Sequence, residues 1–266
     1  RIKIFMDGLL VTLGCSWVKG IGANYEEGMT REEYQKHRFS DEHIKPYAFP
    51  TLLAERNNLE LVSFGVGGSS NKRQFRKATE FFSSPRFEEY QNKYSTIIVL
   101  WGLTSTARDE QYDIETKKWK NFLYGTSYRI SDPDYADYSE LMLRRFYDHG
   151  VEVNLLSDQM RHWNEFFKYK GVKNMWFDIL NPHDYKYEFD NLCMDDGDPR
   201  DLLSRVTTHK TRDRFHFSLQ ETDCSRVAKG IVTKTLNPHS NHPTKKGHEK
   251  IFSLLDPYVK ELLPHS

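Results

Sequence analysis

Two short segments near opposite ends of the chain carry the residue types that serine-based acyl transfer requires. The first is the apolar stretch 9–13 running into Gly14-Cys15-Ser16-Trp17, and the second is His242-Pro243-Thr244-Lys245-Lys246-Gly247-His248. A serine hydroxyl becomes a strong nucleophile when a histidine takes its proton, and the two side chains can come from distant parts of a chain. The order and spacing of the segments indicate Ser16 as a nucleophile and His242 as a general base.

Ser16 has a second interpretation that the sequence leaves open. Gly14 and the small Cys15 permit a sharp turn after a strand, which would place Ser16 at the carboxyl edge of a sheet, where open α/β sheets bind ligands. A serine in this position is also typical of the cap of a following helix. Cys15 is itself a nucleophile by residue type, but nothing in the local sequence activates its thiol, so we expect a buried small residue.

Two further segments follow predicted strands and offer hydrogen-bond donors. Gly67-Gly68-Ser69 comes after residues 59–64, and successive glycines let backbone N–H groups face an anion or an oxyanion. The spacing fits neither the phosphate-binding loop, which needs a Lys-Ser/Thr pair, nor the dinucleotide fingerprint, so a plain turn is the alternative. Thr104 and Ser105 follow residues 94–101 and can donate hydroxyl groups to a ligand.

Apolar segments alternate with amphipathic ones along the chain, and this alternation predicts the fold class. We expect strands at residues 9–13, 59–64, 94–101 and 173–180, and helices at residues 31–37, 51–57, 71–82, 135–148, 151–169 and 247–263. The continuous apolar run within 94–101 is typical of a central parallel strand covered on both faces. The pattern indicates an α/β three-layer sandwich with a mostly parallel central sheet flanked by helices.

The domain organisation follows from the same pass along the chain. No linker is evident, so we expect one domain over residues 1–266. Residues 106–134 are polar and aromatic without a clear period, which predicts an irregular surface insertion. Residues 181–235 are polar with Pro182, Gly197 and Pro199, which predicts a second insertion of loops and short helices.

Composition excludes several classes of protein. The chain has 38 basic and 38 acidic residues, so its formal charge is zero and we expect no nucleic-acid partner. The local cluster of Lys72, Arg73 and Arg76 is interpreted as a solvated helix face. No apolar run approaches the ~20 residues that cross a membrane, and no secretory segment is visible. We therefore expect a soluble, cytoplasmic protein, although the start at Arg1 leaves a trimmed leader open.

Cysteine and histidine usage bears on disulfides and metals. Three cysteines do not indicate a disulfide framework, but a single bridge between Cys193 and Cys224 stays open. His239, His242 and His248 form a cluster whose spacing is not that of a zinc helix, and no nearby Cys or acid completes a ligand set. We therefore expect no metal and no cofactor, and a structural role for His248.

With these segments in this order, the chain resembles the SGNH (GDSL-like) hydrolase family. The family's Gly-Asp-Ser block corresponds to Gly14-Cys15-Ser16, its oxyanion glycine to Gly68, its Gly-x-Asn block to Gly102-Leu103-Thr104, and its Asp-x-x-His-Pro block to His239-Ser240-Asn241-His242-Pro243. Residues 50–71 are the most specific part of the resemblance, whereas 106–134 and 181–235 match no family segment. The resemblance implies a divergent member with the flavodoxin-like SGNH fold.

Three residues depart from the family pattern. Cys15 replaces an Asp that is not usually the nucleophile or the base. Thr104 replaces the Asn oxyanion donor, and loss of one such donor costs on the order of 10²–10³ in rate. His239 stands where the triad Asp is expected, and removal of an orienting Asp costs on the order of 10⁴. A backbone carbonyl, Ser240, or an acid of the second insertion such as Asp201 or Asp223 would then have to orient His242.

The resemblance implies a serine esterase that cleaves a small acyl ester, often acetyl on a carbohydrate, through a covalent acyl-enzyme. The backbone N–H groups of Ser16 and Gly68, with the Thr104 side chain, would hold the oxyanion. The first insertion carries aromatic side chains that can stack on sugar rings or pack as a lid: Trp119, Phe122, Tyr124, Tyr128, Tyr135 and Tyr138. Because two family residues are missing, a catalytically degenerate binding protein is one alternative. An acyltransferase is the other, since the same acyl-enzyme serves hydrolysis and transfer.

Overall fold

A parallel sheet lies between two layers of helices. The computed structural model describes residues 7–124, 132–179, 183–192 and 234–264. Within these residues four strands form a parallel sheet in the order β2-β1-β3-β6. The strands are β1 (Gly8–Leu13), β2 (Leu59–Ser63), β3 (Ile97–Leu103) and β6 (Lys173–Asp178). The predicted α/β class, with a parallel sheet flanked by helices, is confirmed.

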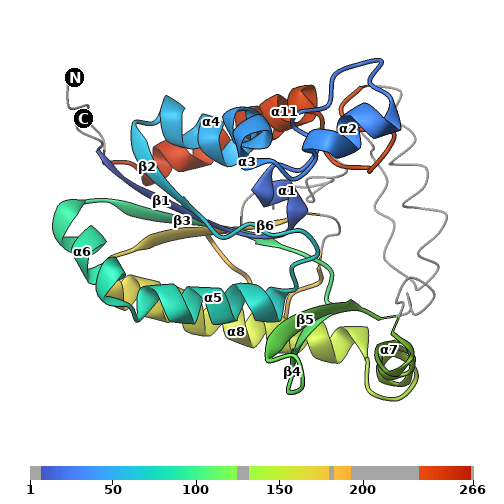
Figure 1. The fold of residues 1–266 in the computed structure, drawn as a ribbon. Helices are drawn as coiled ribbons and strands as arrows, with labels where there is room; N and C mark the ends of the chain where they lie inside the picture. Colours follow the sequence, from blue (N-terminus) through green and yellow to red (C-terminus); the bar gives the residue numbers. More distant parts are fainter. Residues whose placement is uncertain (1–6, 125–131, 180–182, 193–233, 265–266) are drawn as a thin grey trace.

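The two helical layers cover opposite faces of the sheet (Figure 1). One layer contains α4 (Phe49–Arg56) and α11 (Lys245–Leu262), and the other contains α5 (Asn71–Phe82), α6 (Pro85–Lys93) and α8 (His149–Lys170). Side chains alternate along a strand, so β1 supplies both cores: Leu10 packs with the α4 and α11 side, whereas Leu9 and Val11 pack with the α5 and α8 side. Because both faces of such a strand are buried, its sequence is almost continuously apolar.

Local capping signals explain where several helices begin and end. Thr30 and Glu33 form a capping box that begins α2 (Arg31–His37), and Ser70 accepts from the Arg73 N–H at the start of α5. Both helices have the bounds predicted from the sequence. The short elements α1 (Ser16–Lys19), α3 (Asp41–Ile44) and η1 (Lys45–Tyr47) lie with α2 between β1 and α4 along the chain.

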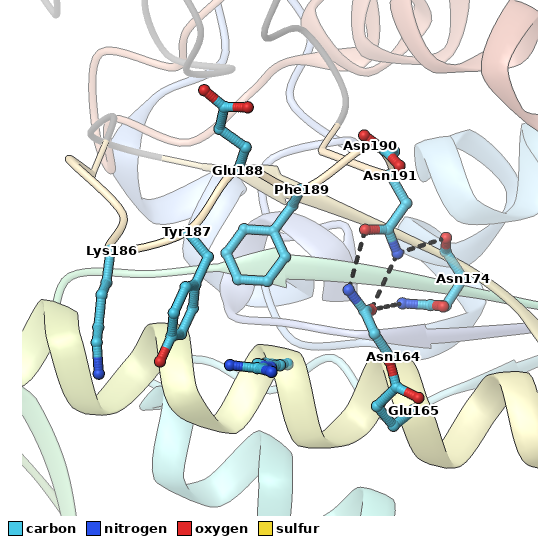
Figure 2. A pocket seen from close by; sticks show the side chains of 10 residues that line it. Asn164, Glu165, Asn174, Lys186, Tyr187, Glu188, Phe189, Asp190 and Asn191 are labelled. Atoms are coloured by element: carbon cyan, nitrogen blue, oxygen red, sulfur yellow. Dashed lines mark hydrogen bonds between the residues drawn. The ribbon is translucent and has the colours of Figure 1, made fainter.

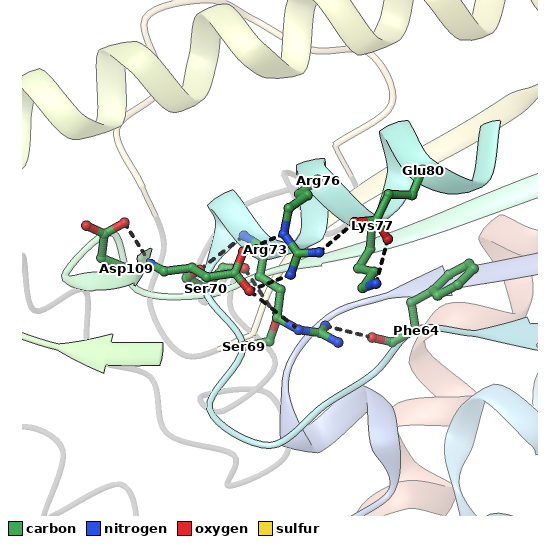
Figure 3. Close-up of polar contacts among 9 residues, drawn as sticks. Phe64, Ser69, Ser70, Arg73, Arg76, Lys77, Glu80 and Asp109 are labelled. Atoms are coloured by element: carbon green, nitrogen blue, oxygen red, sulfur yellow. Dashed lines mark hydrogen bonds and ion pairs between the residues drawn. The ribbon is translucent and has the colours of Figure 1, made fainter. Parts of the chain in front are cut away.

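The sequence pattern predicted an irregular insertion at residues 106–134, and this prediction is wrong for the described residues 106–124. They contain an antiparallel hairpin of β4 (Arg108–Asp113) and β5 (Lys118–Leu123), with Tyr112 paired to Trp119. Ion pairs and hydrogen bonds hold the hairpin against α5. Arg76 makes two hydrogen bonds to the Glu110 carboxylate at 2.7 and 2.8 Å, and Lys72 lies 2.8 Å from Asp109. Figure 3 shows Arg76 and Lys77 of α5 directed at the Glu80 carboxylate of the same helix. The charged residues of β4 and β5 obscure the apolar alternation that predicts a strand. Their partners on α5 are distant in sequence, so no local pattern predicted the hairpin.

The same ion pairs correct the interpretation of the basic cluster on α5. Lys72, Arg73 and Arg76 do not form a solvated face, since each lies within ion-pair distance of Asp109 or Glu110. Both carboxylates are buried, and the ion pairs hold the hairpin against the helix.

Three other features of the secondary structure differ from the prediction. Helix α6 was not predicted, although Ser84 caps it and Pro85 occupies its first turn. Gly150 lies inside the first turn of α8 rather than between two helices. β3 continues through Gly102, where a Cβ would lie 2.7 Å from Ile179 Cδ1, so the glycine allows a close approach. Helix α7 (Pro133–Arg145) begins near its predicted start.

Several predictions fall outside the described residues or are not tested by them. Tyr128, Cys193, Cys224, Asp201 and Asp223 lie outside the described ranges. The assignment of residues 1–266 to one domain with two insertions stays a prediction. Among the residues that are described, no helix has both the length and the apolar character needed to cross a membrane.

Candidate active site

Three predicted site residues follow three neighbouring strands. β1 is paired in parallel with β2 and with β3, with Thr12 opposite Ser63 and Leu13 opposite Trp101. Ser16 comes just after β1, the Gly67-Gly68 loop follows β2, and Thr104 directly follows β3. Because the carboxyl ends of parallel strands meet at one edge, the three segments lie together there.

Ser16 is the first residue of α1 and does not cap the helix. Cys15 occupies the cap position, with extended backbone and no side-chain cap hydrogen bond. Gly14 is required by packing, since a Cβ there would lie 2.2 Å from Val18 Cγ2. The Ser16 residue is 7% exposed. Within the described residues its hydroxyl makes no hydrogen bond, while its carbonyl accepts from the Ile21 N–H at 3.0 Å. Cys15 is fully buried, as expected.

The glycine loop after β2 lies directly on α1. A Cβ on Gly65 would be 2.5 Å from the Lys19 backbone nitrogen, so the loop and the helix that carries Ser16 touch through their main chains. Gly68 has φ +72 with open space around a virtual Cβ, so its conformation rather than crowding favours glycine. The Gly68 N–H forms no hydrogen bond with a described residue, which leaves it available to a ligand.

Thr104 is clamped by Asn71, a residue that the sequence reasoning missed. The Asn71 Nδ2 donates to the Thr104 carbonyl and the Asn71 Oδ1 accepts from the Thr104 N–H, both at 2.9 Å. Asn71 is the first residue of α5, so the helix start is tied to the end of β3. The Thr104 Oγ1 is buried and has no hydrogen-bond partner. Asn71 therefore positions the main chain, while the Thr104 hydroxyl stays available.

His242 is oriented by a main-chain carbonyl. Its Nδ1 lies 2.7 Å from the carbonyl oxygen of Ser240. A carbonyl only accepts, so the proton must be on Nδ1 and the lone pair on Nε2. This is the ring orientation that the Asp of a catalytic triad imposes. Ser240 thus supplies, through its backbone, the hydrogen bond that the sequence could not assign.

Burial keeps His242 neutral. Desolvation lowers the pKa of His242 to about 4, the hydrogen bond to Ser240 opposes that shift, and the positive charges of Arg38 and Arg108 add to it. At neutral pH the imidazole therefore carries no charge and its Nε2 can accept a proton. The same low pKa makes it a weaker base than an unshifted histidine.

His242 is packed against the segment that follows Ser16. Gly22 has φ +96, and a Cβ on it would lie 2.8 Å from the His242 Cβ. The turn that carries His242 is closed by an antiparallel bridge between Leu236 and Pro243 and by Thr244, which caps α11. No hydrogen bond joins Ser16 to His242, both of which are among the described residues.

The other two histidines of the C-terminal segment have separate roles. His239 does not reach the His242 ring nitrogen, because its Nε2 donates to the Met29 carbonyl at 2.9 Å. His248 is fully buried in α11 and stacks on Phe49, whose N–H donates to its Nδ1 at 3.4 Å. No cluster of three metal-ligating side chains occurs among the described residues.

A buried polar network supports Thr104 from the side of β6, and the sequence reasoning did not identify it. The His183 Nε2 lies 3.3 Å from the Thr104 carbonyl oxygen, and the backbone N–H of His183 donates to the Asp178 carboxylate at 3.2 Å. The His183 ring is 6.0 Å from that of His149, which contacts Thr106 at 3.1 Å. These residues surround the end of β3 and brace its main chain.

A cavity of about 770 Å³ lies elsewhere and contains none of the predicted site residues. It is bounded by α8 and by residues 186–191, and Asn164, Asn174 and Asn191 form part of its wall (Figure 2). These three amides are hydrogen-bonded to one another at 2.8–3.2 Å. Asn174 is near the amino end of β6, whereas Ser16 follows the carboxyl end of β1, so the cavity is not part of the candidate site.

The aromatic residues of the hairpin region mostly pack on one another. Phe122 contacts Tyr135 and Tyr138 with ring centroids 5.4 and 5.2 Å apart, and Tyr124 is buried with its hydroxyl donating to Asp109. Trp119 is 46% exposed, and the Arg76 guanidinium lies 4.4 Å from its ring centroid.

Comparisons with known proteins give distant structural similarities alone. No protein-family model matches the chain, and no curated protein matches it. Among solved structures, an acetyl xylan esterase (Est2A) from the rumen bacterium Butyrivibrio proteoclasticus aligns with a TM-score of 0.43 and 10% identity. The alignment covers 96% of this chain and 64% of that chain, so the chain spans less than two thirds of the esterase's length.

Proposed function

We propose that the chain is a serine esterase of SGNH type, with Ser16 as nucleophile and His242 as general base. The observation that carries the proposal is the 2.7 Å hydrogen bond from His242 Nδ1 to the Ser240 carbonyl, in a turn packed against the segment that follows Ser16. It leaves the His242 Nε2 lone pair free to accept a proton. The hydrogen bond stands in for the triad Asp that is absent at His239.

The reaction would proceed in two halves. His242 Nε2 takes the Ser16 proton while the hydroxyl oxygen attacks the ester carbonyl. The tetrahedral intermediate collapses to an acyl-enzyme as His242 returns that proton to the departing alcohol. Water then attacks the acyl-enzyme while His242 takes its proton, and His242 gives that proton to the Ser16 oxygen as the C–O bond breaks and the carboxylic acid leaves. The N–H groups of Ser16 and Gly68, with the buried Thr104 hydroxyl, would donate to the oxyanion in both halves.

The lack of a Ser16–His242 hydrogen bond is consistent with this role. Catalytic hydrogen bonds are often long without substrate and shorten in the complex. The Ser16 hydroxyl and the Gly68 N–H both lack partners among the described residues, as groups awaiting a ligand would. The substrate class we propose is a small acyl ester, including an acetyl ester of a carbohydrate. Trp119 and its cross-strand neighbour Tyr112 are the most exposed aromatic side chains among the described residues of the hairpin, at 46% and 49%.

Labelling with a fluorophosphonate probe tests the proposal. Intact-mass spectrometry would compare wild type with Ser16→Ala and His242→Ala, and with Ser105→Ala as a matched control for a serine at the same sheet edge. One adduct that is lost in Ser16→Ala and His242→Ala, and retained in Ser105→Ala, is expected. No adduct on the wild type, or an adduct that survives Ser16→Ala, would show the assignment to be wrong.

A binding protein that keeps the site without turnover is the second candidate. The low His242 pKa, set by burial, favours it, because a weak base removes the Ser16 proton less readily. Ligand binding that survives Ser16→Ala and His242→Ala, with no probe adduct on the wild type, would establish it. Acyl transfer to an acceptor other than water stays a prediction from the resemblance, and product analysis with added sugar acceptors tests it.

A further inference from the structure

The ring of His239, at the position where the family resemblance expects the triad acid, is bonded to the segment before α2. Its Nε2 lies 2.9 Å from the Met29 carbonyl oxygen. A carbonyl only accepts, so the proton is on Nε2 and the imidazole donates. The backbone N–H of the same histidine donates to the Asn237 side-chain oxygen at 2.7 Å. His239 is therefore held through both its side chain and its main chain.

The acceptor of this hydrogen bond is itself fixed by the cap of α2. The Met29 carbonyl belongs to the same peptide unit as the Thr30 N–H, which donates to the Glu33 carboxylate at 2.7 Å in the capping box. A peptide unit is planar, so a hydrogen bond at its N–H also fixes the direction of its carbonyl. The helix cap thus aims a main-chain acceptor at His239.

Two tyrosine rings pack around the His239 imidazole. The centroid of the Tyr25 ring is 5.7 Å away at an interplanar angle of 74°, and that of the fully buried Tyr34 ring is 6.3 Å away. The Tyr25 contact is edge-to-face, an arrangement that aromatic rings favour. The imidazole is hence part of the contact between the C-terminal segment of the site and the chain around α2.

Main-chain hydrogen bonds connect the position of His239 to that of His242. The Asn237 N–H donates to the His242 carbonyl at 2.8 Å, and the Asn237 carbonyl accepts from the Asn241 N–H at 2.8 Å, so the turn is closed. Asn241 has φ +56, a left-handed conformation that asparagine adopts more readily than most residues. The Ser240 carbonyl, which bonds His242 Nδ1, comes one residue after the anchored histidine.

We propose that His239 is a positioning residue for the general base, which it holds indirectly by anchoring the turn that orients His242. The acid of a catalytic triad bonds the base directly. His239 instead bonds the Met29 carbonyl and leaves the direct contact to Ser240. No step of the reaction involves His239 itself. The effect on turnover rests on the proposed function, whereas the effect on the His242 ring does not.

The position of the base must be held closely for proton transfer. A displacement of about 1 Å can cost on the order of 10²-fold in rate. In a triad the acid sets both the tautomer and the orientation of the base. Here the Ser240 carbonyl sets the tautomer of His242, and that carbonyl moves with the turn. An anchor on the turn therefore supplies the restraint that a main-chain carbonyl alone does not.

Magnetic resonance of the His242 ring tests the anchor without any substrate. The histidine rings would be labelled with ¹⁵N, and the His242 signals identified by their absence from His242→Gln. In the wild type at neutral pH we expect Nδ1 to resonate as a protonated ring nitrogen and Nε2 as an unprotonated one. His239→Phe keeps a ring between the tyrosines and removes the donor. We expect its His242 Nδ1 signal to move toward the unprotonated range, as the two tautomers mix.

Further variants separate anchoring from folding. His239→Gln restores an N–H donor at a reach similar to that of the imidazole Nε2, so its His242 signals should return to the wild-type range. His239→Met, which removes the donor without a second bulky ring, replaces His239→Phe if that protein does not fold.

Tyr34→Phe is the matched control for a lost contact between the turn and α2. It removes the 3.0 Å contact between the hydroxyls of Tyr34 and Ser240, which involves the Ser240 side chain and not its carbonyl. The His242 signals should therefore stay as in the wild type. Unchanged His242 signals in His239→Phe, or an equal displacement in Tyr34→Phe, would overturn the role of His239.

Ester kinetics then connect the ring to turnover. With 4-nitrophenyl acetate, kcat and kcat/KM of His239→Phe should fall by the same factor, on the order of 10²-fold, because His239 does not contact the substrate. His239→Gln should recover both constants to within about 10-fold of the wild type. A fall in kcat/KM with kcat unchanged would place His239 in substrate binding and contradict the proposal. A wild type that turns over no ester would refute the proposed function, while the ring signals would still decide the role of His239.

Discussion

Asn71 holds the main chain of Thr104 by two hydrogen bonds of 2.9 Å, one to its carbonyl and one from its N–H. The Thr104 hydroxyl, in contrast, is buried without a partner. The residue is thus fixed in place while its one side-chain donor is left unused. A group in this state costs folding free energy and gains an acceptor only when a ligand arrives.

Replacement of Thr104 by Val therefore separates stability from activity. Thr104→Val keeps the shape and removes the unpaired hydroxyl, so we expect the free energy of unfolding to stay constant or rise by up to about 1 kcal/mol. If the hydroxyl donates to the oxyanion, kcat should fall on the order of 10²-fold. Urea unfolding and ester kinetics measure the two effects.

Thr106→Val is the matched control for that substitution. The Thr106 Oγ1 contacts the Tyr147 hydroxyl at 2.9 Å and His149 Nδ1 at 3.1 Å, so its removal should lower the free energy of unfolding by about 1–3 kcal/mol. A Thr104→Val protein that is destabilised like Thr106→Val but fully active would contradict the oxyanion role.

The pH dependence of ester hydrolysis should be displaced toward acid. The base must be neutral, and burial lowers the pKa of His242 to about 4, from an ordinary value of 6.5. For a neutral ester, kcat/KM should be flat above about pH 6 and should fall as the pH drops through about 4. Arg38→Gln and Arg108→Gln each remove a positive charge and should move the midpoint upward. A wild-type midpoint near 6.5 would be evidence against this environment for His242.

His248 should make the fold sensitive to acid. Burial lowers the pKa of His248 to about 3, so below pH 6.5 the unfolded chain takes up a proton that the folded chain refuses. The free energy of unfolding should fall as the pH is lowered from 6.5 toward 3, by at most about 1.4 kcal/mol per pH unit from this group. His248→Gln should flatten that slope in urea titrations at successive pH values. The exposed His162→Gln should leave the slope as it is in the wild type.

Contact between the Gly65 loop and α1 should be intolerant of a methyl group. In Gly65→Ala the new Cβ would lie 2.5 Å from the Lys19 backbone nitrogen, where no side chain can move aside. We expect a loss of about 2 kcal/mol or more in the free energy of unfolding, as in overpacked sites, and a loss of probe labelling at Ser16. Gly150→Ala in the first turn of α8 should be neutral or stabilising. Equal stability of the two variants would contradict the close approach.

Local patterns in the sequence predicted the fold class and much of its order. The apolar run that includes β3, the capping residues of α2 and α5, and the turn glycines all act within a few residues of themselves. The β4–β5 hairpin was missed because its charged strands are held by residues of α5. The register of that contact depends on Arg76 and Glu110, which lie 34 positions apart in the chain.

The candidate site was predicted only as far as its side chains carry family-like signals. Ser16, Gly68, Thr104 and His242 have recognisable neighbours in the sequence. The clamp of Thr104 by Asn71 arises from packing between separate elements, and no local pattern encodes it.

Because a main-chain carbonyl orients His242, the hydrogen bond does not depend on the amino acid at position 240. Every missense change at position 240 alters the side chain and leaves the main-chain oxygen in place, so none of them deletes the acceptor of His242. A lineage that orients its histidine in this way is free to lose the acid at position 239, provided that the turn from Leu236 to Pro243 keeps its shape. Selection would then act on the conformation of that turn rather than on the side chain at position 240.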